Sequence, residues 1–196
     1  MLTSPVLGEV DPGLRIGEVT EHAAAEVASV MQLDGHVVDE RMARGCRCFV
    51  ARLGDEVVAF GWLATGTEWI GEVELEITPE RDAAYIWNCA THPAHRRKGF
   101  FRSLVTGIAA QAQREGLNRL WIGTLDIPAA KGVTDAGFVP AMRFTSVWMY
   151  GVRWLRARQA DSVDPALLMS ARQVLAIAGV PLRLGSSMKR AEQRRH

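Results

Sequence analysis

The stretch of sequence that decides the fold is Ala84-Tyr85-Ile86-Trp87-Asn88-Cys89-Ala90-Thr91-His92-Pro93-Ala94-His95-Arg96-Arg97-Lys98-Gly99-Phe100-Phe101-Arg102. Residues 84–91 are apolar enough to form a strand buried on both faces, and Pro93 ends it. From Phe100 onwards the apolar residues recur at helical spacing as far as Ala112, and Gly116 ends the helix. The stretch therefore predicts a central strand, a short basic loop and an amphipathic helix.

The basic loop has the features of an anion site. A helix N-terminus carries unpaired N–H groups and about half a positive charge. Gly99 lets the backbone approach a ligand closely, and Arg96, Arg97 and Lys98 add charge-assisted hydrogen bonds. These residues predict a phosphate or pyrophosphate site, although a solvated basic turn before an ordinary helix has the same composition. A single glycine fits neither the phosphate loop of nucleotide hydrolases nor the Gly-x-Gly-x-x-Gly of dinucleotide binders.

The flanking sequence predicts an α/β fold with a central mixed, mostly antiparallel sheet flanked by helices, followed by a C-terminal helical extension. The expected strands cover residues 14–19, 46–51, 56–64, 72–77 and 117–125, and a hairpin joins 138–150 to 152–158. The expected helices cover residues 21–33, 37–44, 129–135 and 165–178. We expect an N-terminal tail over residues 1–13, one domain over 14–158, and a helix with a basic tail over 159–196.

Composition limits the class of protein. The chain has 196 residues, of which 48% are hydrophobic and 23% charged, with a net charge of +1. These values fit one globular domain with a small appendage and exclude intrinsic disorder. No apolar run approaches the ~18 residues of a membrane helix, so we expect no membrane partner. Three cysteines favour a reducing compartment, hence a cytoplasmic location, and no Cys/His spacing indicates a metal site.

Charge and apolar patterning near the C-terminus bear on partners. Residues 151–196 carry a net charge of +6, and the remainder carries −5. No aromatic residues interleave with the basic ones at the chain end, so we expect a solubilising tail and no nucleic-acid partner. The helix expected at 165–178 has one apolar face, which either packs on its own domain or pairs with a second subunit in a homodimer.

The quoted stretch resembles the signature of the GCN5-related N-acetyltransferases, the GNAT superfamily. That pattern is Arg/Gln-x-x-Gly-x-Gly/Ala between a strand and a helix. Arg96 and Gly99 match it, whereas Phe101 stands where the family has Gly or Ala. The order of elements over residues 14–150 agrees as well, so the resemblance covers roughly three quarters of the chain.

The resemblance continues further along the chain, with departures. Asp126 stands where the family tends to have the Asn of Asn-x-x-Ala, and Ala129 matches the Ala. The family's Leu-Tyr pair is replaced by Gly132-Val133, and its Gly-Phe pair is present as Gly137-Phe138. Val133 therefore stands where many members carry the tyrosine that protonates the leaving thiolate.

What the resemblance implies is a site for acetyl-CoA, or another acyl-CoA, beside the central strand. The pyrophosphate would lie on the motif, mainly on main-chain N–H groups, at Arg96, Arg97, Lys98, Gly99, Phe100, Phe101 and Arg102. Main-chain groups of Cys89, Ala90 and Thr91 would hold the pantetheine arm, and one N–H would polarise the thioester carbonyl. Asp126 would lie near the thiol arm.

Two residues are candidates for proton transfer. Tyr85, on the central strand, is a candidate acid, a base acting through water, or a shelf for the substrate. It equally fits a half-buried aromatic that is hydrogen-bonded at the sheet edge. Glu74 shares one expected strand face with Glu72 and Glu76, and would bind a cationic amine or act as a base. The same alternation fits an ordinary exposed face.

The resulting functional expectation is an N-acetyltransferase that passes an acetyl group from acetyl-CoA to the primary amine of a small molecule by direct attack. Two alternatives stay open. One is acetylation of a protein or peptide amine. The other is a degenerate domain that binds acyl-CoA without turnover, which Val133 and Phe101 favour.

Overall fold

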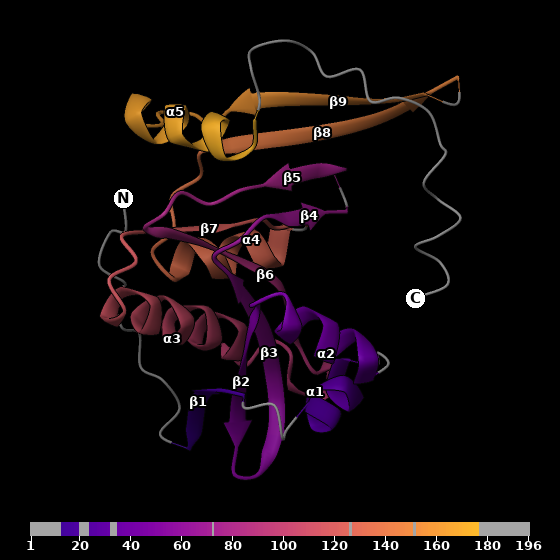
Figure 1. The fold of residues 1–196 in the computed structure, drawn as a ribbon, viewed down its shortest axis with the longest axis vertical. Coiled ribbons are helices and arrows are strands. Elements are labelled where there is room, and N and C mark those ends of the chain that lie inside the picture. Colours follow the sequence, from indigo (N-terminus) through magenta and orange to yellow (C-terminus); the bar gives the residue numbers. More distant parts are fainter. Residues whose placement is uncertain are drawn as a thin grey trace. The chain divides into compact units, whose positions relative to one another are not determined.

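The computed structural model describes residues 13–19, 24–31, 35–71, 73–125, 127–150 and 152–176. Their contacts divide them into two compact units (Figure 1). The first unit comprises the described residues up to 67 together with 78–138, and the second comprises 68–77 and those from 139 onwards. Asp126, Glu72 and nearly all of the two expected tails lie outside the described residues. The expected domain limits of 14–158 stay a prediction.

The first unit is built on a five-stranded sheet in the order β1-β2-β3-β6-β7. Its strands are β1 (Leu14–Glu18), β2 (Arg47–Leu53), β3 (Glu56–Ala64), β6 (Ala83–Thr91) and β7 (Arg119–Ile122). Neighbouring strands are antiparallel except β6 and β7, which are parallel because a helix crosses between them. The expected mixed, mostly antiparallel sheet is therefore confirmed.

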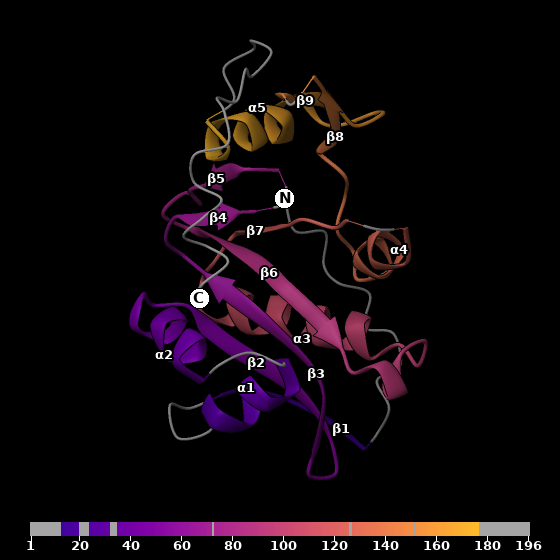
Figure 2. The same cartoon turned by 90° about the vertical axis from the view of Figure 1, so that its right-hand side faces the viewer.

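Helices cover both faces of this sheet (Figure 2). They are α1 (Ala24–Met31), α2 (Gly35–Ala43) and α3 (Phe100–Arg114), and α4 (Ile127–Asp135) contacts α3. On one face, Leu104 and Ile108 of α3 pack into a core with apolar residues of β3 and β6. On the other, Val27 of α1 and Val38 of α2 pack on Trp62. Burial on both faces explains why β3 and the first half of β6 are continuously apolar.

The second unit contains two hairpins and a helix. The hairpins are β4 (Glu68–Ile70) with β5 (Leu75–Ile77), and β8 (Met142–Met149) with β9 (Val152–Gln159). Leu75 and Leu155 lie at the centre of its small core. Helix α5 (Pro165–Val174) begins where Asp164 caps it, accepting hydrogen bonds from the N–H groups of residues 166 and 167. The expected hairpin and final helix are thus confirmed, although β8 begins at Met142 and not at 138, and α5 ends at Val174 and not at 178.

Two further expected strands, apart from β8, are shorter than their patterns suggest. The strand expected over 72–77 begins only at Leu75, because Glu74 lies in a turn with φ +52°. The alternation of apolar and acidic residues therefore runs across a turn, and Glu74 does not share a strand face with Glu76. The strand expected over 117–125 is limited to β7. Among the described residues, no helix is long and apolar enough to span a bilayer.

Candidate functional site

The parallel strands β6 and β7 stop pairing halfway along β6. Their pairing runs from Ala83 opposite Arg119 to Ile86 opposite Ile122, where β7 ends. Strand β6 continues to Thr91, still paired on its other side with β3. Those main-chain polar groups of residues 87–91 that point away from β3 therefore have no partner on β7. Unpaired strand edges bind extended ligands through their N–H and C=O groups.

A β-bulge interrupts β6 at this same place. Phe60 pairs with Ala90 and Trp62 with Trp87, so Asn88 and Cys89 together oppose Gly61. Asn88 has φ +43°, a conformation that asparagine tolerates better than most residues. A Cβ on Gly61 would lie 2.6 Å from Cys89 Sγ, so glycine is what lets the thiol pack there. The bulge re-aims the main chain from Cys89 to Thr91.

The expected basic loop and helix follow directly. A short 3₁₀ turn over Pro93–His95 leads into Arg97 and Gly99, with φ +65° and +84°. Gly99 is the N-cap of α3, without a side-chain cap hydrogen bond, and the first turn holds no acidic residue. A Cβ added to Gly99 would meet no atom within 4 Å. The first N–H groups of α3 are therefore left without a side-chain cap, and the space beside Gly99 is open, which suits an anion.

The three cationic residues of this loop, Arg96, Arg97 and Lys98, differ in their contacts. Arg97 and Lys98 are exposed and form no ion pair with any residue that the structure describes. The Nε of Arg96, in contrast, donates to the Thr91 carbonyl at 3.3 Å. Arg96 thus ties the loop to the end of β6, while Arg97 and Lys98 add positive charge at the helix start.

Of the two histidines of the stretch, His95 ties the loop to a neighbouring strand. His95 Nε2 lies 3.0 Å from Glu56 Oε1, and its ring centroid is 6.0 Å from that of Phe100. Glu56, His92 and His95 form a group whose ligand atoms lie within 4.8 Å of one another, a geometry able to hold a metal ion. The direct bond between Glu56 and His95 explains their approach without an ion.

The candidate proton donor lies where the strands part. Tyr85 is 6% exposed and pairs with Trp121 near the end of β7. A Cβ on Gly123 would lie 3.5 Å from the Tyr85 hydroxyl oxygen, so the phenol reaches the residue just past β7. Val133, at the position of the family's tyrosine, is buried on α4 and has no proton to give. Glu74 belongs to the second unit and is partly buried.

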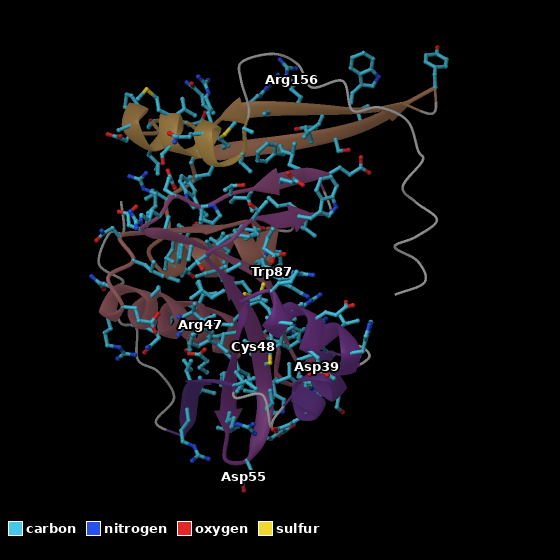
Figure 3. All side chains as sticks on the ribbon, in the orientation of Figure 1. Asp39, Arg47, Cys48, Asp55, Trp87 and Arg156 are labelled. Atoms are coloured by element: carbon cyan, nitrogen blue, oxygen red, sulfur yellow. The ribbon has the colours of Figure 1, made fainter. Side chains whose placement is uncertain are left out.

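The cysteines near the site are not nucleophiles. Burial raises the pKa of the Cys89 thiol to about 12, although the residue as a whole is only partly buried. The sulfur donates to the Trp87 carbonyl at 3.5 Å. Cys48, on β2 (Figure 3), also has its pKa raised to about 12 by burial. At neutral pH both thiols are protonated and behave as small apolar groups.

Sequence reasoning missed a contact on the α2 side of the bulge. The guanidinium carbon of Arg41 lies 4.6 Å from the ring centroid of Trp87, labelled in Figure 3, and 5.2 Å from that of Trp62. An asparagine within an apolar strand, opposite a glycine, was a usable signal for the bulge. Nothing in the sequence pairs a helix residue at 41 with a strand residue at 87.

Comparison with known proteins identifies relatives. A family model described as the acetyltransferase (GNAT) family matches residues 20–133. No curated protein gives a significant match.

Solved structures share the fold. The ribosomal-protein-S18-alanine N-acetyltransferase from Escherichia coli is 16% identical, with a TM-score of 0.51 over 66% of this chain and 81% of that one. A Trypanosoma brucei acetyltransferase is 13% identical, with a TM-score of 0.50 over 69% and 99%. The aminoglycoside acetyltransferase meta-AAC0020 from an uncultured soil metagenomic sample is 16% identical, with a TM-score of 0.47 over 63% and 85%.

Proposed function

The chain belongs to the GNAT family of acetyltransferases, and we propose that it transfers an acetyl group from acetyl-CoA to the primary amine of a small molecule. Enzymes of this family generally use acetyl-CoA as the donor. The acceptor is the finer part of the proposal, since the structural neighbours include enzymes named for aminoglycosides and for ribosomal protein. Acceptor pockets are built from loops that vary within one fold.

The observation that carries the proposal is the open N-terminus of α3. Its N-cap, Gly99, has φ +84° and open space at its Cβ position, and no side-chain cap or first-turn acid competes for the N–H groups of the helix. The donor set fits a diphosphate. Main-chain N–H groups of residues 97–102 would hold the diphosphate of acetyl-CoA, and Arg97 and Lys98 would add Coulomb attraction. Arg96 would keep the loop in register through Thr91.

Residues Cys89, Ala90 and Thr91 would hold the pantetheine arm. Their support is the β6 edge, which no longer pairs with β7 beyond Ile86. The bulge at Asn88 sets the direction of the N–H groups that follow it, so that one can point at a carbonyl oxygen. An N–H aimed at that oxygen would stabilise the negative charge that develops during attack.

Acetyl-CoA supplies an activated thioester acyl group, and the chain's own residues must manage the protons. The attacking amine must be neutral, and the leaving thiolate must be protonated. We propose that Tyr85 donates this proton, because Val133 cannot and because the Tyr85 hydroxyl lies beside Gly123, just past the end of β7. Glu74, which belongs to the second unit, stays a prediction for the acceptor's amine. Asp126 stays a prediction for the thiol arm.

A second candidate function is acyl-CoA binding without turnover. It is favoured by the buried Val133 at the usual tyrosine position. One assay separates the possibilities. Free thiol release is followed with acetyl-CoA and a panel of small amines and peptides, beside calorimetric titration of CoA. Turnover with small amines supports the proposal, and turnover with peptides alone supports a protein acceptor. Tight CoA binding without thiol release supports the binding module, and the absence of CoA binding refutes all three.

A further inference from the structure

We infer that Arg41 is a positioning residue that holds the β6 bulge in its unusual shape and thereby sets the rate of acyl transfer. The part that concerns rate rests on the proposed function. The part that concerns the bulge rests on contacts within the first unit, between α2 and β6.

Arg41 contacts the bulge in two ways. Its guanidinium lies over the rings of Trp87 and Trp62, whose centroids are 6.1 Å apart. With the Asn88 amide oriented so that its oxygen faces α2, that oxygen accepts hydrogen bonds from Nη1 at 2.7 Å and Nη2 at 3.1 Å. One side chain therefore contacts the bulged residue and both tryptophans that frame it.

The bulge needs such support because its backbone is strained. Asn88 has φ +43°, which costs an L-residue free energy unless the surroundings fix it. On the α3 side, the Cys89 sulfur packs against Gly61. On the α2 side, Arg41 holds the Asn88 amide. The bulge is thus fixed from both faces of the sheet, by apolar packing on one and by charge-assisted hydrogen bonds on the other.

The chemistry of this contact requires arginine. A guanidinium is planar, stacks on aromatic faces, and presents two N–H groups to one acceptor, whereas the lysine ammonium is a compact point charge. Lysine at position 41 would keep the charge and lose the stacked, two-donor geometry. The expected order of bulge rigidity is therefore arginine, then lysine, then methionine.

Loss of this support should act on chemistry more than on donor binding. The diphosphate would lie on residues 97–102, outside the bulge, and only the contacts of the pantetheine arm with residues 89–91 would loosen, so affinity for CoA should fall by no more than threefold in Arg41→Met. The N–H groups after Asn88 would lose their fixed direction. Because removal of an oxyanion-stabilising donor costs about 10²–10³-fold in kcat, we expect a loss of about tenfold when the donor is only loosened.

Three variants test this. Arg41→Met removes the guanidinium, Arg41→Lys keeps the charge, and Asn88→Gly keeps a positive φ while removing the amide. Arg114→Met, at an exposed arginine in the last turn of α3, is the matched control. The kcat is expressed per CoA-binding site from titration, so that misfolded protein is not counted. We expect Arg41→Met and Asn88→Gly each to lower kcat, and their combination to lower it no further than either alone.

Hydrogen exchange of the CoA-free protein tests the bulge independently of any activity. In Arg41→Met and Asn88→Gly, amides of residues 87–91 should exchange at least tenfold faster than in wild type, while those of β2 and α3 keep their rates. Arg114→Met should match wild type at residues 87–91. Unchanged exchange there in both folded variants, or an unchanged kcat, would overturn the inference. If wild-type protein neither binds CoA nor transfers acetyl groups, the proposed function fails, and the exchange rates still decide whether Arg41 holds the bulge.

Discussion

The ring of Phe101 packs directly against Gly132. A Cβ on Gly132 would lie 2.8 Å from Phe101 Cδ1, closer than real Cβ contacts, and 3.2 Å from Cε1. Each of these residues departs from the GNAT pattern, which has a small residue at the first position and a leucine at the second. The two departures compensate each other, because the bulk missing from α4 is supplied by α3. Phe101 is therefore no sign that the donor loop has degenerated.

This compensation predicts the stability of variants. Gly132→Leu should destabilise the protein by roughly 1–3 kcal/mol, the usual cost of overpacking. Phe101→Ala/Gly132→Leu should recover at least half of that loss, because the leucine then has space. Urea unfolding of wild type, both single variants and the double variant measures this coupling. Additive effects of the two substitutions would show that the two side chains do not share one space.

The Gly99 position predicts a defect in donor binding. Gly99→Asp places a negative charge before the N–H groups proposed to hold the diphosphate. A hydrogen bond to a charged group contributes about 1.5–3 kcal/mol, so the Kd for acetyl-CoA should rise at least tenfold. The control is Gly116→Asp, since Gly116 has φ +85° and equally open space at the other end of α3. Both variants carry the same strain, and equal affinity in the two would remove the loop from donor binding.

The Tyr85 hydroxyl predicts a defect in turnover. Tyr85→Phe keeps the buried ring and removes the proton, so kcat should fall by roughly 10²-fold, as for loss of a general acid, while CoA affinity stays within twofold. Tyr150→Phe is the control, because Tyr150 is the other tyrosine of the chain and is 99% exposed. Steady-state kinetics and titration measure the two effects. Wild-type turnover in Tyr85→Phe would exclude this residue from catalysis.

An ion pair far from the loop predicts acid sensitivity. Arg47 (Figure 3) joins β1 to α3, since it donates to Glu18 at 2.5 and 2.8 Å and to Glu115 at the same distances. These bonds lower the pKa of Glu115 from 4.5 to about 2. A carboxylate with a depressed pKa stabilises the fold above its ordinary pKa, and this contribution is lost as pH falls from 4.5 to about 2.

The measurement is the free energy of unfolding between pH 7 and pH 2. Glu115→Gln should be less stable than wild type at pH 7, and the two curves should converge as the pH approaches 2. The exposed Glu76→Gln is the control and should follow wild type throughout. Parallel curves for Glu115→Gln and wild type would show that the ion pair makes no pH-dependent contribution to the free energy of unfolding in this range.

Most of the architecture was predictable because it follows from local patterns. The apolar run at 84–91, the helical spacing from Phe100 and the Asp164-Pro165 cap each specify an element from neighbouring residues alone. The pattern of alternating apolar and acidic residues predicted a strand that includes Glu74, but this alternation continues through a turn. Two contacts join elements that are distant in sequence: Phe101 packs against Gly132, and Arg41 donates hydrogen bonds to the Asn88 amide. Such contacts depend on how helices pack on a sheet, which no local pattern records.

The most direct test of the account is a crystal structure of the protein with bound acetyl-CoA. We predict that oxygens of the diphosphate accept hydrogen bonds from main-chain N–H groups of residues 97–102, in front of Gly99, and that the pantetheine arm runs along β6 beyond Ile86. Acetyl-CoA bound elsewhere, or bound with this loop turned away from its diphosphate, would contradict the account.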